Sequence, residues 1–393
     1  MTSQFRSPAR MRELTSFKVM DVLEAAQALE AQGQDIVHLE VGQPDFATPG
    51  HIVAAAERAI ADGYTGYTHS LGLLALREGI CEHYHDRYGV SVSPEQIVVT
   101  SGTSPAMLLL FSALCEVGDE VILPNPHFAC YPNFLRYLGV GIRYVDLSAS
   151  DGYLYHADAV REHIGSRTRA VLVNSPANPT GAVLPPEMLA QVAELGPYVV
   201  SDEIYHGLTY GAGQDHSILE YTDRAFALNG FSKRYAMTGW RLGYVIAPRE
   251  LVPTMQVMQQ NFFICAADFV QHAGLQALRH GWADVERMRA EYDARRRLIV
   301  PRLRELGLDI PYEPQGAFYL LAGAQHLSDD SLRLAFDILN EAKVAVAPGS
   351  DFGPGGEGHL RFSYANSRER IEEGLGRLGE WVRGCQFLGD VRR

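Results

Sequence analysis

The sequence has few of the features that mark secreted, metal-binding or membrane proteins. Its 393 residues include five cysteines, which are odd in number, widely scattered and never arranged as a CxxC pair. Such cysteine usage fits reduced thiols and excludes a disulfide framework. No histidine cluster has metal-ligand spacing, no apolar run could span a bilayer, and the amino terminus lacks the apolar core of a signal peptide. We therefore expect a cytoplasmic protein with no metal site and no membrane partner.

An excess of positive charge is also missing. Lysine and arginine total 34 against 47 aspartates and glutamates, for a formal net charge of −13. Nucleic-acid-binding proteins concentrate positive charge on one face, so we expect no nucleic-acid partner. The stretch GPGGEG at 353–358 fits the GxGxxG pattern but precedes an expected strand, which indicates a loop and not a dinucleotide site.

Short apolar runs alternate with helical patterns through the first two thirds of the chain. The runs are rich in β-branched residues and bounded by turn signals, which is typical of buried strands in a mostly parallel sheet. They lie at 96–100, 120–124, 169–174, 198–203 and 226–230. The intervening helical patterns lie at 105–116, 128–138 and 186–194. This alternation predicts an α/β fold with helical crossovers.

The pattern changes after about residue 250, where long helical stretches begin. The charged segment 283–306 predicts a connecting helix, and the amphipathic segment 17–32 predicts a helix that joins the carboxyl-terminal unit. Further strands are expected at 317–323, 344–348 and 359–365, with a helix near 330–342. The chain is long enough for two domains. We expect residues 49–295 to form a large domain, and residues 1–48 and 296–393 to form a small one.

Polar loops follow four of the expected strands, and the carboxyl ends of such strands line the crevice where α/β proteins bind ligands. After 96–100, Gly102 permits a tight turn and Thr103 or Ser104 can cap a helix whose amino terminus would attract an anion. The other three loops read SPANPTG, SDEIY and SK, and begin at residues 175, 201 and 232. We expect all four loops to converge on one crevice.

Lys233 lies in one of these loops among apolar neighbours that include Phe231, Met237 and Trp240. A buried ammonium is costly without a partner, and a single buried lysine is usually an ion-paired structural residue. A lysine desolvated in a crevice is, however, more readily the neutral nucleophile that attacks an aldehyde. Its position next to a ligand crevice favours this chemical role.

The stretch GFSKRYAMTGWRLG at 230–243 resembles the pyridoxal-phosphate lysine signature of the class I and II aminotransferases. Other marks of that family follow its order along nearly the whole chain. They are GQPDF (42–46), NPTG (178–181), DEIY (202–205) and RFSYA (361–365). The resemblance implies the fold type I architecture, with a large domain built on a seven-stranded sheet, a small domain made from both termini, and a homodimer with shared active sites.

The resemblance also implies that pyridoxal 5′-phosphate is held as a Schiff base on Lys233, which then moves a proton as general base and acid. Asp202 would keep the pyridine nitrogen protonated, although a structural cap is its alternative role. Asn178 and Tyr205 would hydrogen-bond the phenolic oxygen, with Asn174 in support.

The remaining roles that the resemblance implies concern the phosphate, the ring and the substrate. The phosphate would lie on the helix opening Gly102–Thr103–Ser104, with Ser232, Arg241 and, from the neighbouring subunit, Tyr67. Phe128 would stack on the ring. Arg361 would clamp the substrate α-carboxylate, assisted by Gly42 and Asn178, although an ordinary salt bridge is its alternative role.

Transfer of an amino group between an L-amino acid and a 2-oxo acid, through pyridoxamine phosphate, is the expected activity. A lyase, synthase or oxidase on the same cofactor is the alternative, because the scaffold does not fix the outcome; the unaltered NPTG favours transfer. A non-catalytic sensor fused to a DNA-binding domain is disfavoured because only 16 residues precede residue 17 and the chain is acidic.

The substrate side chain is expected to be neutral. Ser104 stands where one branch of bacterial aspartate aminotransferases has a lysine, and Phe17 and Phe128 predict an apolar pocket. An unpaired second carboxylate would be costly there. Arg12 is the alternative cation that would reverse this expectation.

Overall fold

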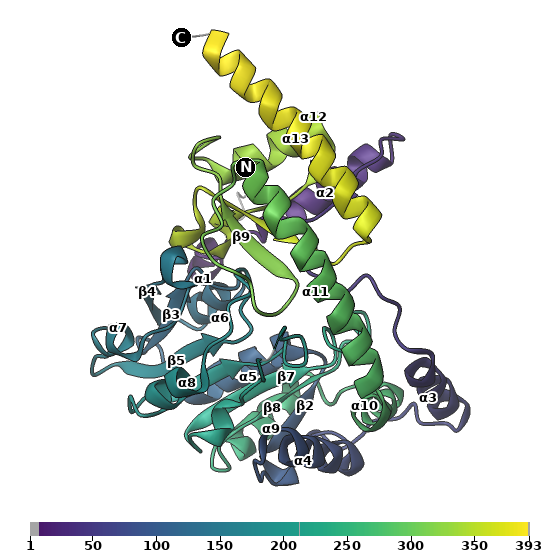
Figure 1. Ribbon diagram of the computed structural model, residues 1–393. Coiled ribbons are helices and arrows are strands. Elements are labelled where there is room, and N and C mark those ends of the chain that lie inside the picture. Colours follow the sequence, from purple (N-terminus) through teal and green to yellow (C-terminus); the bar gives the residue numbers. More distant parts are fainter. Residues whose placement is uncertain (1–7, 212, 392–393) are drawn as a thin grey trace, which may run out of the picture.

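The computed structural model describes residues 8–211 and 213–391, and a seven-stranded sheet lies at the centre of its larger part (Figure 1). The strand order is β2-β8-β7-β6-β5-β3-β4. Only β8 runs antiparallel to its neighbours. The strands are β2 (Ile97–Thr100), β3 (Glu120–Asn125), β4 (Gly141–Asp146), β5 (Thr168–Asn174), β6 (Tyr198–Asp202), β7 (Ala225–Gly230) and β8 (Gly243–Ile246). The expected α/β fold with a mostly parallel seven-stranded sheet is confirmed.

Alternate residues of the central strands serve two hydrophobic clusters, one on each face of the sheet. On β5, Val171 and Val173 belong to one cluster, and Ala170 and Leu172 belong to the other. A strand buried on both faces needs a nearly continuous apolar run, which is why these strands were visible in the sequence. The first face is covered by α3 (Gly50–Ala61), α4 (Leu74–Tyr88), α7 (Ala157–Arg161), α8 (Pro186–Ala193) and α10 (Asp268–His280); the second by α5 (Thr103–Leu114), α6 (Tyr131–Tyr137) and α9 (Val252–Phe262).

Both ends of the chain build the second, smaller part of the molecule. The parallel pair β1 (Val37–His38) and β10 (Val344–Ala345) joins them directly. Beside it, β11 (Ala347–Pro348), β12 (His359–Ser363) and β9 (Tyr319–Gly323) form an antiparallel sheet in that order. The helices of this part are α2 (Lys18–Glu30), α12 (Ser331–Ala342) and α13 (Arg368–Val391), whereas α1 (Ala9–Arg12) lies against α6 of the larger part.

The long helix α11 (Trp282–Glu305) connects the two parts and runs in Figure 1 from beside α10 to beside α13. On it, Arg295 is buried and its guanidinium donates to both carboxylate oxygens of Asp45 at 2.7 and 2.9 Å. The domain boundary that we placed at 295/296 falls inside this helix. The division into residues 1–48, 49–295 and 296–393 stays a prediction.

Several elements differ from those expected, among them three strands of the two larger sheets and β1 (Val37–His38), for which no strand was expected. The expected strand 344–348 divides into β10 and β11, which belong to different sheets. Strand β4 was missed because it lies at the sheet edge and alternates exposed and partly buried residues, a weak signal in GIRYVD. Strand β8 was missed because its four residues, GYVI, are too short a run to separate from the preceding lysine loop. The stretch 353–358 is a loop with a short 3-10 turn at Pro354–Gly356 before β12, as expected.

Within residues 8–211 and 213–391, no helix is sufficiently long and apolar to cross a bilayer. No group of three or more histidine, cysteine, aspartate or glutamate side chains in those ranges could hold a metal ion.

Candidate active site

A pocket of about 280 Å³ lies where the ends of the central strands meet the smaller part of the molecule. The structure brings twelve of the fourteen predicted site residues together in its lining. They are Gly42, Thr103, Ser104, Phe128, Asn174, Asn178, Asp202, Tyr205, Ser232, Lys233, Arg241 and Arg361. Gly102 lies just behind the lining, and Tyr67 lies outside it with 84% of its surface exposed. The convergence of the four loops is thus present, while the chemical role of each residue stays a prediction.

Lys233 follows β7 and extends into the pocket, where it is half-buried. Its Nζ donates a hydrogen bond to the backbone oxygen of Gly42 at 2.6 Å. Burial, followed by the nearby positive charges of Arg361 and Arg241, lowers the pKa of Lys233 to about 8. The neutral amine that nucleophilic attack requires is therefore accessible close to neutral pH.

Asp202 is the last residue of β6 and is almost completely buried. Burial raises the pKa of its carboxyl to about 6, although two hydrogen bonds to the carboxylate oppose this rise. Tyr131 donates its hydroxyl to Oδ2 at 2.6 Å, and the Ile204 N–H donates to Oδ1 at 3.2 Å. Tyr131 was not predicted as a site residue, because an aromatic residue at the start of a buried helix reads as core in the sequence.

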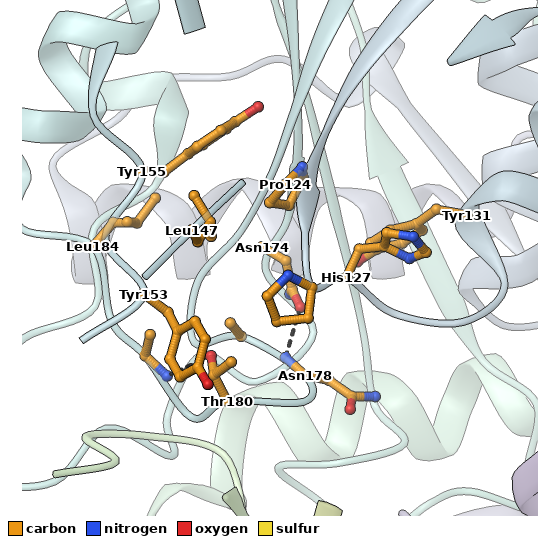
Figure 2. A pocket seen from close by; sticks show the side chains of 13 residues that line it. Pro124, His127, Tyr131, Leu147, Tyr153, Tyr155, Asn174, Asn178, Thr180 and Leu184 are labelled. Carbon is orange, nitrogen blue, oxygen red and sulfur yellow. Dashed lines mark hydrogen bonds between the residues drawn. The ribbon is translucent and has the colours of Figure 1, made fainter. Parts of the chain in front are cut away.

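The loop after β5 is held by its own asparagines (Figure 2). The Asn178 N–H donates to Oδ1 of Asn174 at 2.9 Å, and Nδ2 of Asn174 donates to the Asp202 backbone oxygen at 2.9 Å. A second, enclosed cavity of about 20 Å³ lies against this loop and is lined mainly by apolar groups such as Leu147 and Leu184. In Figure 2 the amide of Asn178 points away from that cavity. The cavity has room for about one water molecule and none for a cofactor.

Arg361 lies on β12 with only 2% of its surface exposed. Nη1 donates to Oδ1 of Asn178 at 3.0 Å, Nη2 donates to the Glu40 backbone oxygen, and the buried Nε has no hydrogen-bond partner among the described residues. The rings of Tyr319 and Phe352 lie 4.4 and 4.8 Å from the guanidinium carbon. Arginine remains protonated in proteins, so this buried cation has a donor to spare for a substrate carboxylate.

The start of α5 forms the end of the pocket where an anion was expected to bind. Gly102 is its N-cap residue, with φ +97°, and no side chain caps the helix, so the expectation that Thr103 or Ser104 would cap it is wrong. A Cβ at Gly102 would lie 2.4 Å from Nη2 of Arg241, so the guanidinium sits directly against the glycine. Free N–H groups at a helix start attract anions, and Arg241 adds positive charge. With Ser104 and Ser232 also lining the pocket, this donor set fits a phosphate.

Tyr205 and Tyr319 meet at the side of the pocket that faces β9. Both are buried, and their hydroxyl oxygens lie 3.1 Å apart with Tyr205 donating. A Cβ at Gly42 would lie 2.1 Å from the Tyr319 hydroxyl, so only glycine fits at that position. Tyr319 was also missed from the sequence, since in AFYLLAG it reads as one more apolar strand residue.

The chain is similar to known proteins along almost its entire length. The family described as "Aminotransferase class I and II" matches residues 34–378. A (5-formylfuran-3-yl)methyl phosphate transaminase of Methanocaldococcus jannaschii is 39% identical over 377 residues, which are 95% of this chain and 98% of that one. An aspartate/prephenate aminotransferase of Thermus thermophilus is 38% identical over 376 residues, 94% of this chain and 97% of that one.

Solved structures agree with the sequence relatives. The aspartate aminotransferase of Thermus thermophilus with maleate superimposes with a TM-score of 0.91 at 38% identity, covering 96% of this chain and 100% of that chain. An aminotransferase from Mycobacterium tuberculosis gives 0.92 at 35% identity, with 97% and 100% covered. The pocket carries the donors that a pyridoxal phosphate site needs, and the relatives are named aminotransferases. The chain belongs to the class I and II aminotransferases and is a pyridoxal-phosphate-dependent enzyme that moves an amino group between an amino acid and a 2-oxo acid.

Proposed function

We propose that this aminotransferase prefers neutral L-amino acids to aspartate as amino donors. The observation that supports this proposal is the charge of the pocket lining. Among the residues that the structure describes, three cations line it, namely Lys233, Arg241 and Arg361. Lys233 would be bonded to the cofactor, Arg241 would bind the cofactor phosphate, and Arg361 would bind the substrate α-carboxylate. None of the three would then be left to bind a second carboxylate.

The rest of the lining on the substrate side is apolar. We call the cluster formed by Phe17, Val19, Met20, Met107 and Phe128 the apolar rim. The rings of Phe17 and Phe128 meet edge to face, with centroids 6.1 Å apart. Burying a methylene group contributes about 0.8 kcal/mol, whereas an unpaired carboxylate in such surroundings costs several kcal/mol. Aliphatic and aromatic side chains therefore fit the apolar rim better than the side chain of aspartate.

The chemistry of transfer is assigned to residues at the other end of the pocket. When bound, pyridoxal phosphate supplies an aldehyde for an amine and a ring that accepts the electron pair freed at the substrate α carbon. Lys233 would hold this cofactor covalently and, once free, move the α proton, since its lowered pKa makes the neutral amine available. Asp202 would place a buried negative charge beside the pyridine nitrogen. Arg361 would orient the substrate through its α-carboxylate.

Steady-state kinetics across donors test the substrate proposal. We expect kcat/KM for at least one of alanine, leucine and phenylalanine to exceed that for aspartate, with 2-oxoglutarate as acceptor. A preference for aspartate of tenfold or more, about 1.4 kcal/mol, would mean that a further cation serves the pocket. The same assay distinguishes transfer from a lyase reaction, because elimination would release ammonia without consuming the oxo acid.

We also propose that the enzyme acts as a homodimer in the cytoplasm. Tyr67 supports the dimer, because so exposed an aromatic side chain outside its own pocket is suited to reach the phosphate of a second copy. The described cysteines, Cys81, Cys115, Cys130 and Cys265, are all free, which suits a reducing compartment.

Coexpression of an inactive variant and a weakened variant tests the sharing of sites. Mixed dimers of Lys233→Ala and Tyr67→Phe protomers would contain one site with both native residues and one with neither. We expect their activity to exceed that of the mixed parent homodimers. Activity that never exceeds the parental sum would show that Tyr67 serves its own subunit.

A further inference from the structure

Tyr319 occupies a position between the cofactor end and the substrate end of the pocket. It lies on β9, where Leu321 is paired with Arg361 of β12, so that Tyr319 is the diagonal neighbour of Arg361 on the same face of the sheet. Its ring stands 4.4 Å from the Arg361 guanidinium carbon, and its hydroxyl lies 3.1 Å from that of Tyr205. Tyr319 thus contacts both Arg361, which is assigned to the substrate, and Tyr205, which is assigned to the cofactor.

The ring of Tyr319 supports a cation that has no carboxylate partner. Arg361 is buried, and within the described ranges no acidic side chain lies within salt-bridge distance of it, although the carboxylates of Asp351 and Glu40 are near enough to favour its charged form. Its hydrogen bonds go to the neutral groups of Asn178 and Glu40, the latter through its backbone oxygen. A buried guanidinium gains substantially from an aromatic face when water is excluded. The ring therefore stabilises the positive charge of Arg361 and holds the plane of its guanidinium.

The hydroxyl of Tyr319 acts on Tyr205. Each phenol has one proton, and Tyr205 donates its proton to Tyr319 in this arrangement. If Tyr205 instead donates to the phenolic oxygen of the cofactor, its own oxygen becomes free to accept from Tyr319. A donor that itself accepts a hydrogen bond is strengthened in the low-dielectric interior.

We propose that Tyr319 is a positioning residue with two separable functions: its ring holds the substrate-binding guanidinium of Arg361, and its hydroxyl aligns and strengthens the hydrogen bond from Tyr205 to the cofactor. The inference rests on the proposed roles of Arg361 and Tyr205. It predicts that the two functions can be removed one at a time, because they belong to different atoms of one side chain.

Two substitutions in the holoenzyme separate them. Tyr319→Phe keeps the ring and removes the hydroxyl. We expect the pH at which the visible absorption of the bound cofactor changes to move upward by about 0.4 to 1 unit, because a weakened donor stabilises the cofactor's phenolate less. The dissociation constant of acetate, a simple carboxylate probe, should remain within twofold. Tyr319→Leu removes the ring as well, and should weaken acetate binding by about fivefold to thirtyfold.

Tyr292→Phe is the matched control, since it removes a buried hydroxyl from the same core that has no hydrogen-bond partner among the described residues. It should change neither measurement. Tyr319→Met, which is closer in volume to the native residue, replaces Tyr319→Leu if that variant does not fold. An unchanged absorption titration in Tyr319→Phe would overturn the hydroxyl function, and unchanged acetate binding in the leucine or methionine variant would overturn the ring function. Failure of the underlying assignment looks different: the parent enzyme would lack the absorption band, or Arg361→Lys would leave acetate binding unchanged.

Discussion

The two ends of the pocket are built by different parts of the chain and differ in how deeply their side chains are buried. The polar floor, formed by Asn174, Asn178, Asp202 and Tyr205, comes from the ends of β5 and β6, and each of these side chains is at least nine-tenths buried. Hydrogen bonds join Asn174 to Asn178 and to the Asp202 backbone, and Tyr131 donates to the Asp202 carboxylate. The apolar rim instead includes residues at the start of α2, where Met20 is 43% exposed.

Under the proposed roles, the polar floor would determine the reaction type and the apolar rim would determine the substrate. The polar floor is tied to the sheet, so changing it alters the groups that handle the cofactor for every donor. The start of α2 is held by the smaller part of the molecule and not by the central sheet: Val19 packs with Ala347 and Phe352, and the Asp351 carboxylate accepts from the Lys18 and Val19 N–H groups at 3.1 Å. The apolar rim could therefore change while the chemistry stays the same, which agrees with the different substrates named for the relatives.

The largest effect at the cofactor end of the pocket is expected from removing Lys233, which extends over the polar floor. Lys233→Ala should lower kcat by at least about a thousandfold for all donors alike, because nucleophile and proton carrier are lost together. The chain has only three lysines, Lys18, Lys233 and Lys343. Borohydride reduction of the yellow holoenzyme should therefore fix the cofactor on the peptide containing Lys233, and a Lys18→Arg/Lys343→Arg variant should be labelled equally. Label on either of the other two lysines would refute the assignment.

A smaller loss is expected at Arg361, which joins the two ends. Arg361→Lys keeps the charge but loses the planar fork that binds a carboxylate with two hydrogen bonds. We expect kcat/KM to fall by about ten- to a hundredfold, as for loss of a hydrogen bond to a charged group. The fall should be equal for alanine and phenylalanine, since both carry the same α-carboxylate. A donor-dependent loss would place Arg361 in the side-chain pocket instead.

Changing the rim should produce a moderate, donor-dependent effect. Phe17→Ala is expected to lower kcat/KM for phenylalanine by about tenfold, the value of a lost aromatic pair with Phe128, and to leave alanine within about twofold. Met11→Ala, on the exposed α1 just before this segment, is the control and should change neither donor. Equal losses for both donors would show that Phe17 contributes to the chemistry and not to specificity.

The smallest expected effect is a shift along the pH axis. Burial holds the pKa of Asp202 at about 6, and the hydrogen bond from Tyr131 opposes that rise. Tyr131→Phe removes this hydrogen bond, so the pKa of Asp202 should rise by about 0.5 to 1 unit. Since the carboxylate is the useful form, activity lost on acidification should be lost at a higher pH. An acid limb that does not move would mean that another group controls it.

The sequence predicted the sheet and most of the pocket because both depend on local patterns. Buried parallel strands such as β5 are continuous apolar runs, and the loops that follow them carry unusual polar residues such as Asn178 and Asp202. The sequence could not reveal Tyr131 and Tyr319, because their hydroxyls acquire meaning only through partners 71 and 114 residues away. Strand β4 escaped because an edge strand with exposed residues has no distinctive hydrophobic pattern.

The buried charge of Arg361 has a consequence for thermal stability. Its desolvation lowers the pKa of the guanidinium, and the nearby carboxylates of Asp351 and Glu40 offset this only in part. Keeping a charged side chain buried costs free energy, and replacing it with a well-packed apolar side chain often makes the folded protein more stable. Arg361→Met is therefore expected to raise Tm while it abolishes carboxylate binding. Adding a carboxylate ligand should raise the Tm of the parent protein and leave that of the variant unchanged, because only the parent keeps the guanidinium that binds the ligand in the folded state.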